Sequence, residues 1–149
     1  MDLSVDLGGL RLINPVIAAS GTFGYGLEYS SLINLNSLGA FCTKGISLKP
    51  KTGNPVPRVI ETSSGMLNAI GLENIGIEAF LSEKLTQLQH INTCVIVNFF
   101  GDTCYEYVEM ARALSDVDRL SALEMNVSCP NVDKGGLQFS SDPEILTEV

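Results

Sequence analysis

Short apolar segments alternate with amphipathic segments along most of this chain. The apolar runs contain four or five residues and are bounded by glycine, proline or polar residues, as in the buried strands of parallel sheets. The amphipathic segments repeat large apolar residues at helical spacing. The predicted strands span 16–19, 39–43, 94–97 and 122–125, with an extended piece at 58–62 and a loop at 65–72. The predicted helices span 28–35, 76–89 and 103–114. Another helix is predicted to begin at Asp142-Pro143, with Asp142 as its cap.

The first dozen residues follow a different pattern. Apolar residues occupy every second position from Leu3 to Leu7, and the alternation resumes at Leu10 and Leu12 after Gly8-Gly9. Strict alternation on both sides of a glycine pair predicts a short β-hairpin with a Gly-Gly turn.

Strands that alternate with helices predict βα units and a parallel sheet with right-handed connections. Four polar residues, Ser20, Lys44, Asn98 and Asn126, each follow the end of a successive predicted strand. In an α/β barrel these ends share one face, and that face holds the active site. A complete barrel needs about 250 residues, and this chain has 149. We therefore predict an α/β fold: a single unit, residues 1–149, that forms the first half of a TIM (β/α)8 barrel preceded by a β-hairpin.

Composition narrows the class of protein. Hydrophobic residues make up 45% of the chain, enough for a sizeable core, and no apolar run approaches the length of a membrane span. The net charge of −8 has the wrong sign for a nucleic-acid surface. The four cysteines include no C-x-x-C pair, there is a single histidine, and the N-terminus has no secretory pattern. We expect no metal site, no membrane or nucleic-acid partner, and a cytoplasmic protein.

The segment 124–131, E-M-N-V-S-C-P-N, has the most specific chemistry. An apolar strand ends in a polar cluster in which Asn126 and Asn131 each offer a hydrogen-bond donor and an acceptor. Cys129 lies between them, and Pro130 stiffens the loop behind it. Two amides and a thiol suit a planar ligand with carbonyl and N–H edges. The alternative is a buried packing cysteine, the common case for this residue type.

Three other places in the chain have polar or flexible residues where a core would not need them. The loop Ser20 to Gly26 is rich in glycine, which lets backbone amides approach a ligand, although such loops are common after strands. Lys44 closes an apolar strand, and its ammonium needs an anionic or polar partner if it stays inside; a solvated loop lysine is the alternative. Asn68 lies in an otherwise apolar loop between two glycines, which indicates that something binds its amide.

Five segments together resemble the dihydroorotate dehydrogenase family, over essentially the whole chain. They are N-P-V-I-A-A-S-G-T-F-G-Y-G (14–26), T-K-G (43–45), G-N-P-V-P-R (53–58), G-M-L-N-A-I-G-L-E-N-I-G (65–76) and N-V-S-C-P-N (126–131). The resemblance implies an FMN-containing α/β barrel that oxidises dihydroorotate to orotate in pyrimidine synthesis. The cysteine at 129, where class 2 enzymes have serine, indicates class 1. The segment 65–72 favours class 1B over the fumarate-using class 1A.

The resemblance also implies a role for each matched residue. Cys129 would be the catalytic base, and Ser20, Lys44, Gly45, Asn98 and Asn126 would contact FMN. Substrate contacts would come from Lys44, Asn68, Ala69, Ile70, Gly71, Leu72, Asn126 and Asn131. Class 1B further implies a homodimer and a second subunit with an iron–sulfur cluster and FAD that passes electrons to NAD.

Other interpretations remain open at this point. A flavin-dependent dihydropyrimidine dehydrogenase shares much of the pattern. A tRNA dihydrouridine synthase also combines FMN with a cysteine, but the acidic charge argues against it. The chain could instead be a non-catalytic half-barrel that serves only as an association module, which binds other protein chains. The family's second half supplies another lysine and the phosphate-binding glycines, so we expect this chain alone to be inactive.

Overall fold

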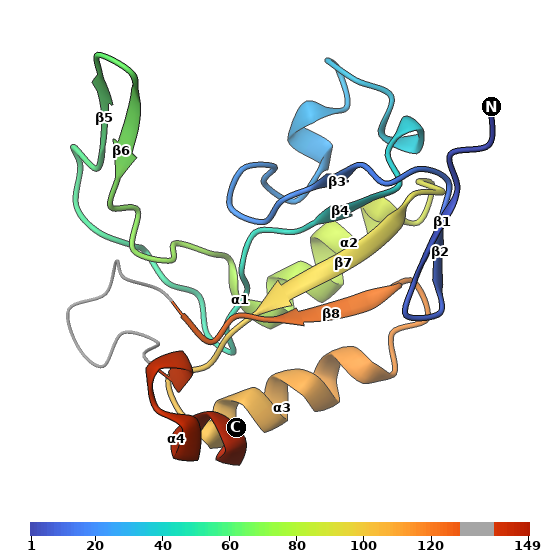
Figure 1. Cartoon of the computed structure of the whole chain (residues 1–149). Helices are drawn as coiled ribbons and strands as arrows, with labels where there is room; N and C mark the ends of the chain where they lie inside the picture. The colour runs from blue at the N-terminus through green and yellow to red at the C-terminus, as the bar shows by residue number, and fades with distance from the viewer. Residues whose placement is uncertain (129–138) are drawn as a thin grey trace.

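A four-stranded parallel sheet forms the centre of the computed structural model, which describes residues 1–128 and 139–149 (Figure 1). Its strands are β3 (Ile17–Ala18), β4 (Ala40–Cys42), β7 (Cys94–Phe99) and β8 (Ala122–Met125), in that order across the sheet. Every pair is parallel, and each strand lies beside the next one in the chain. This sequential order is that of a barrel wall, since a doubly wound sheet reverses direction at a switch point.

Alternation along the strands separates two different faces of this sheet. On one face, Phe41, Val95 and Val97 join the large apolar cluster that includes the helical residues Phe80 and Tyr107. On the other face, Ala40, Cys42 and Ile96 pack with Leu12 of the N-terminal hairpin in a smaller cluster. Helices therefore cover only one side of the sheet, as they do on the outside of a barrel.

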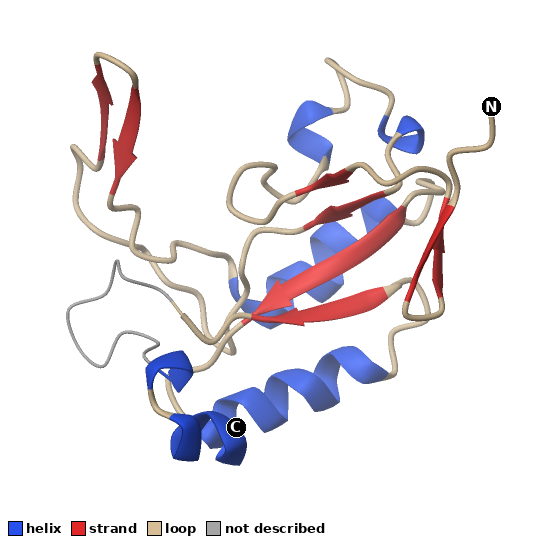
Figure 2. Ribbon diagram, in the orientation of Figure 1, coloured by secondary structure: helices blue, strands red, loops and turns tan. Residues whose placement is uncertain are grey.

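The helices predicted at 76–89, at 103–114 and after Asp142 are present, as Figure 2 shows. The segment predicted at 76–89 is helical in three consecutive stretches: α1 (Gly76–Ala79), a π-helical stretch (Phe80–Lys84) and α2 (Leu85–Leu88). Helix α3 (Cys104–Ser115) begins at Thr103, whose side chain accepts a hydrogen bond from the Glu106 amide. After a 3-10 turn at Phe139–Ser141, α4 (Pro143–Glu148) begins at Asp142, whose carboxylate accepts from the amides of Glu144 and Ile145. The cap predicted at Asp142 is confirmed, and Thr103 caps α3 in the same manner.

The prediction of a helix at 28–35 is wrong. The segment contains two short 3-10 helices, Leu27–Tyr29 and Leu35–Ser37, with turns between them. Local side chains bind the backbone here: the Ser30 hydroxyl donates to the Leu27 carbonyl, and the Asn34 side chain accepts from the Asn36 amide. Serine and asparagine compete in this way with α-helical hydrogen bonds, and the apolar spacing did not reveal it.

The predicted N-terminal hairpin is confirmed. Strands β1 (Val5–Leu7) and β2 (Leu10–Leu12) pair in antiparallel fashion around Gly8 and Gly9. Both glycines have positive φ, of 60° and 93°, as the tight turn requires. The hairpin lies near the beginning of the parallel strands, at the opposite end of the sheet from the polar residues described below (Figure 1).

A second hairpin projects from the body of the molecule as an arm (Figure 1). Strand β5 (Val59–Thr62) matches the predicted extended piece and pairs with β6 (Gly65–Asn68). The predicted loop at 65–72 is therefore wrong in its first half, because cross-strand pairing with β5 is a contact that local sequence does not show. Several large apolar side chains of the arm are exposed, among them Ile60, Met66 and Leu67.

Within residues 1–128 and 139–149, no strand pairs with the outer edge of β3 or of β8. Ile17 of β3 is 36% exposed and Ala18 is only partly buried, so the expectation that this strand is buried is wrong. Leu123 and Met125 of β8 are likewise exposed. In β7, by contrast, all residues except Cys94 are buried, because β4 and β8 flank it on both sides. In the part of the chain that the structure describes, no helix has both the length and the apolar character of a membrane span.

Candidate functional site

A cavity of about 330 Å³ lies at the carboxyl ends of the parallel strands. The four polar residues that follow successive strands, Ser20, Lys44, Asn98 and Asn126, all line it. Asn98 belongs to β7 itself, because this strand runs two residues beyond the predicted end. The other lining residues are Gly21, Thr22, Gly45, Asn68, Ile70, Gly71, Leu72 and Glu73. The prediction that these strand ends converge on one point is confirmed.

The glycine-rich loop after β3 holds one wall of the cavity against the end of β4. The Lys44 amide donates to the Gly24 carbonyl at 2.6 Å, which ties the loop to the strand end. Gly26 has φ of 92°, and a Cβ there would lie 2.6 Å from the Phe41 ring, so a side chain is excluded at this close approach. Phe23 of this loop and Tyr29, which follows it, stack with their ring centroids 4.7 Å apart.

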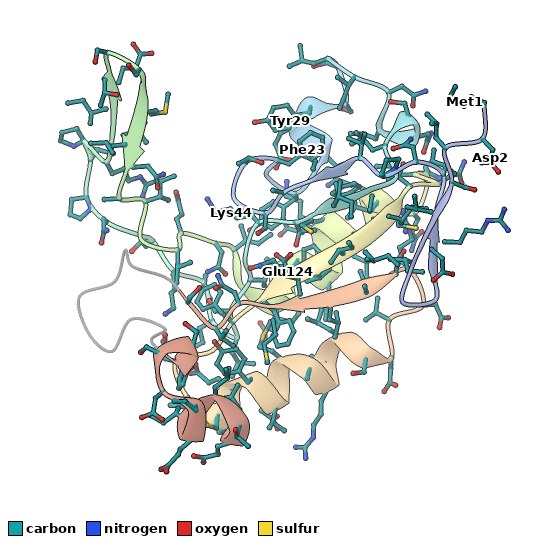
Figure 3. All side chains as sticks on the ribbon, in the orientation of Figure 1. Met1, Asp2, Phe23, Tyr29, Lys44 and Glu124 are labelled. Atoms are coloured by element: carbon teal, nitrogen blue, oxygen red, sulfur yellow. The ribbon has the colours of Figure 1, made fainter. Side chains whose placement is uncertain are left out.

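Lys44 brings a positive charge to this wall. Among the described residues its ammonium forms no ion pair, whereas Lys51, Lys84, Arg58 and Arg112 each contact a carboxylate. Its side chain is partly buried, and Figure 3 shows it at the sheet together with Glu124. The cation is therefore available to a ligand with carbonyl or anionic groups.

The segment that follows the arm forms the opposite wall. Gly71 and Leu72 both have positive φ, of 74° and 56°, a conformation that is costly for a bulky residue such as leucine. Asn74 holds this turn: its buried side chain donates to the Leu72 carbonyl at 2.9 Å and accepts from the Ser47 and Gly76 amides. Backbone strain that is fixed by such contacts is common at ligand sites.

Ala69 is the one described residue of the predicted substrate set that does not line the cavity. Its amide donates to the Arg58 carbonyl and its carbonyl accepts from the Asn54 side chain. It lines a separate apolar depression on the arm, together with Val59 and Leu67. Its neighbours Asn68 and Ile70 both line the cavity, and Asn68 lines the depression on the arm as well.

Asn126 enters the cavity directly after β8. Its amide donates to the Phe99 carbonyl at 2.9 Å, and its side-chain oxygen accepts from the Ser128 amide at 3.1 Å. The buried Tyr107 of α3 donates its hydroxyl hydrogen bond to the Asn126 carbonyl at 2.6 Å. Burial raises the pKa of the Tyr107 hydroxyl to about 12, so this group stays a donor at neutral pH. Predicted residues Cys129 and Asn131 lie outside the described residues.

Glu124, Thr22 and Glu73 are near or in the site, and the sequence reasoning did not single them out. Thr22 and Glu73 line the cavity, and Glu73 forms an ion pair with Arg58. Glu124 of β8 accepts a hydrogen bond from Asn98 at 2.5 Å. Glu124 is exposed at the edge of the sheet, so burial did not require a partner for it, and its only signal in the sequence was an acidic residue in an otherwise apolar strand.

A buried thiol lies beside Glu124. Cys42 Sγ is 3.6 Å from Glu124 Oε2, to which it donates. Burial first, and then the negative charge of Glu124, raise the pKa of the Cys42 thiol to about 11. Cys42 is therefore a protonated packing residue near neutral pH, unlike a nucleophilic or basic cysteine, which needs a lowered pKa.

Comparisons with known proteins agree on one family. The family model described as dihydroorotate dehydrogenase matches residues 2–149. The chain is 55% identical to the dihydroorotate dehydrogenase B (NAD(+)) catalytic subunit of Pelobacter propionicus and 56% identical to that of Geobacter sulfurreducens, over 99% of this chain but 49% and 48% of those proteins. The chain thus spans about half the length of the curated relatives it matches.

A solved structure supports the fold assignment. The crystal structure of DHODH from Eimeria tenella in complex with ferulenol matches 99% of this chain and 41% of its own chain, with a TM-score of 0.79 at 22% identity. Together with the sequential parallel strands and the one-sided helical layer, this match confirms the predicted fold class, half of an α/β barrel.

Proposed function

This chain belongs to the dihydroorotate dehydrogenase family, and we propose that the protein oxidises dihydroorotate to orotate with FMN in pyrimidine biosynthesis. The proposal depends on one observation above all: four successive strand ends bring Ser20, Lys44, Asn98 and Asn126 to a single cavity. The curated relatives are twice as long as the matched segment. Residues 1–149 would therefore supply one part of the site, and the rest of the barrel the other.

The cavity residues fit a flavin ring. A flavin presents carbonyl oxygens and an N–H along its edges, and the cavity wall offers the Lys44 ammonium, the Ser20 hydroxyl and two side-chain amides. Gly45 leaves no side chain beside Asn98, where a Cβ would lie 2.7 Å from the amide oxygen. We assign Ser20, Lys44, Gly45, Asn98 and Asn126 to the cofactor. When bound, FMN supplies the acceptor for the hydride that leaves C6 of the substrate.

The substrate side would use the opposite wall and the shared residues. Asn68 and the strained turn at Ile70, Gly71 and Leu72 line the cavity across from the strand ends. Lys44 and Asn126, with Asn131, would bind the carboxylate and carbonyl groups of dihydroorotate and hold its ring against the cofactor. Ala69 would contribute only as the hinge between the arm and this turn, because it does not line the cavity.

Cys129 is proposed as the base that removes the proton from C5. Loss of this proton and of the hydride at C6 forms the double bond of orotate. A thiolate can accept the proton near neutral pH only where donors or positive charge lower the thiol pKa from its usual value of about 8.5. The cationic Lys44, which lines the cavity, would contribute such a charge.

The names of the relatives also guide the proposal for partners. They are called catalytic subunits of NAD(+) enzymes. We propose that the complete protein is a homodimer and that electrons pass to NAD through a second subunit with an iron–sulfur cluster and FAD.

Anaerobic flavin reduction tests the activity. The experiment uses a full-length family barrel that contains residues 1–149, called the complete barrel below. Dihydroorotate should bleach its flavin absorbance, and dihydrouracil should not. Bleaching by dihydrouracil alone would assign the dihydropyrimidine dehydrogenase activity instead. A barrel that binds no flavin would contradict both of these enzyme activities. The remaining interpretation would then be a non-catalytic protein that only associates with other chains.

A further inference from the structure

Glu124 faces Asn98 across two neighbouring parallel strands. The register pairs these two residues directly, and both side chains project from the face of the sheet opposite the helices. The Asn98 side-chain nitrogen donates to Glu124 at 2.5 Å and to the Ser20 hydroxyl oxygen at 3.4 Å. The two hydrogens of the amide nitrogen are therefore both engaged.

The carboxylate determines which way the Asn98 amide points. An ionised carboxylate accepts hydrogen bonds and cannot donate them, so the amide nitrogen must lie on the Glu124 side. The amide oxygen then lies on the other side, next to Gly45, where a Cβ would approach it to 2.7 Å. With a glutamine or a serine in place of Glu124, either orientation of the amide could be satisfied.

The amide oxygen is left open to the cavity. Asn98 is only 4% exposed, and its side-chain oxygen accepts no hydrogen bond from the described residues. No fully buried polar side-chain atom in the described part of the chain lacks a partner, so this oxygen keeps some exposed surface. The open space beside Asn98 and Gly45 is the cavity.

We infer that Glu124 is a positioning residue that makes Asn98 present an acceptor oxygen, and never a donor, to the bound ring. The ligand edge at this point must then carry an N–H, as the imide edge of a flavin does. The inference rests on the proposed function for the identity of the ring. The orientation of Asn98 follows from the protein alone, so it can be tested separately.

Two variants and a control separate positioning from packing. In the complete barrel, Glu124→Ala removes the acceptor, and Glu124→Gln offers Asn98 either an oxygen or a nitrogen. Cys42→Ala is the control, since Cys42 contacts the same carboxylate at 3.6 Å but does not line the cavity. Flavin affinity is measured by fluorescence titration of the apoprotein, and unfolding by thermal melting.

We expect Glu124→Ala to weaken flavin binding roughly 10- to 100-fold, as for loss of a hydrogen bond to a charged group. The flavin affinity of Glu124→Gln should fall between that of Glu124→Ala and that of the wild type. Cys42→Ala should lower stability and leave flavin affinity unchanged. Wild-type affinity in Glu124→Ala would overturn the inference. An equal loss in Cys42→Ala would also overturn it, because packing alone would then explain the effect.

A second measurement needs no flavin. In protein labelled with ¹⁵N-asparagine, the Asn98 side-chain amide, assigned with Asn98→Ala, should show hydrogens protected from exchange that become exposed in Glu124→Ala. Unprotected hydrogens in the wild type would overturn the inference even if flavin binds. If flavin does not bind at all, the proposed function fails, and the amide spectrum still decides the orientation.

Discussion

The Tyr107 hydroxyl donates a hydrogen bond of 2.6 Å to the Asn126 carbonyl, which joins helix α3 to the point where β8 enters the cavity. Tyr107 is buried against Phe99 and Phe139 in edge-to-face contacts, so its ring cannot shift without disturbing the core. The outer helical layer thereby fixes the backbone position of a residue that lines the cavity.

Replacing Tyr107 with phenylalanine should therefore affect stability and binding together. We expect a loss of about 1 kcal/mol in the free energy of unfolding, because the Asn126 carbonyl loses its partner, and a weaker affinity for flavin. Denaturant unfolding and flavin titration measure the two effects. Tyr105→Phe on the same helix is the matched control, since Tyr105 is 67% exposed. Equal behaviour of the two variants would contradict the assigned role of Tyr107.

Gly45 should not tolerate a side chain. A Cβ at this position would lie 2.7 Å from the Asn98 amide oxygen and 3.4 Å from the Phe100 ring. We expect Gly45→Ala to displace Asn98, to cost roughly 1–3 kcal/mol of stability as overpacking does, and to reduce flavin affinity. Gly65→Ala in the arm is the control, because its nearest neighbour would be 4.0 Å away. Normal flavin binding by Gly45→Ala would show that this wall does not contact the ring.

The role of Cys129 can be tested by replacement with serine in the complete barrel. Serine keeps the size and hydrogen bonding of cysteine but is a far weaker acid than a thiol of pKa about 8.5. The rate of flavin reduction by dihydroorotate should fall by a factor on the order of 10² to 10⁴, with substrate and flavin still bound. Stopped-flow measurements across pH should also lose the ionisation of the thiol. An unchanged rate and pH profile would remove Cys129 from the mechanism.

Stability should decline at alkaline pH because buried groups resist ionisation: Cys42 and Tyr107 above all, and also Tyr25, whose pKa is raised mainly by burial. The pKa of Cys42 rises from 9.0 to about 11, and that of Tyr107 from 10.0 to about 12, in both cases mainly through burial. Between the lower and the upper value the unfolded chain has lost the proton and the folded chain keeps it, so the free energy of unfolding falls as pH rises. Denaturant unfolding, repeated at intervals of about one pH unit from about pH 8 upward, measures how the free energy of unfolding changes with pH.

Cys42→Ala tests the origin of this decline. The variant should remove the part of the slope that begins near 9.0 and leave the part due to the buried tyrosines, Tyr107 and Tyr25. If the slope is the same in both proteins, the thiol does not contribute to it.

Residues 1–149 by themselves should self-associate and should not retain FMN. Among the residues that the structure describes, nothing pairs with the outer edges of β3 and β8. Apolar side chains on these strands, including Ile17, Leu123 and Met125, are exposed. Light scattering should detect oligomers. A charge on β8, introduced by Leu123→Lys, should reduce the amount of oligomer. Leu32→Lys is the control and should reduce it less, because Leu32 is exposed but belongs to neither β3 nor β8. A colourless protein after gel filtration is expected; a monodisperse monomer with stoichiometric flavin absorbance would contradict both expectations.

Local pattern determined most of the secondary structure. The apolar runs became β4, β7 and β8, and Thr103 and Asp142 cap the helices that begin after them. The convergence of Ser20, Lys44, Asn98 and Asn126 was also predictable, because parallel strands place all their carboxyl ends at one edge. These features depend on the spacing of apolar residues and on the order of the strands along the chain, and both can be read from a single sequence.

Only the tertiary structure decided the features that depend on contacts between distant residues. The segment Gly65–Asn68 became a strand because β5 pairs with it. Ala69 does not line the cavity, although its neighbours Asn68 and Ile70 do. Glu124 became part of the site because the register of β8 on β7 places it opposite Asn98, and a shift of one residue would have sent its side chain to the helical face. The sequence contained the acidic residue, but the pairing of two strands determined what its carboxylate holds.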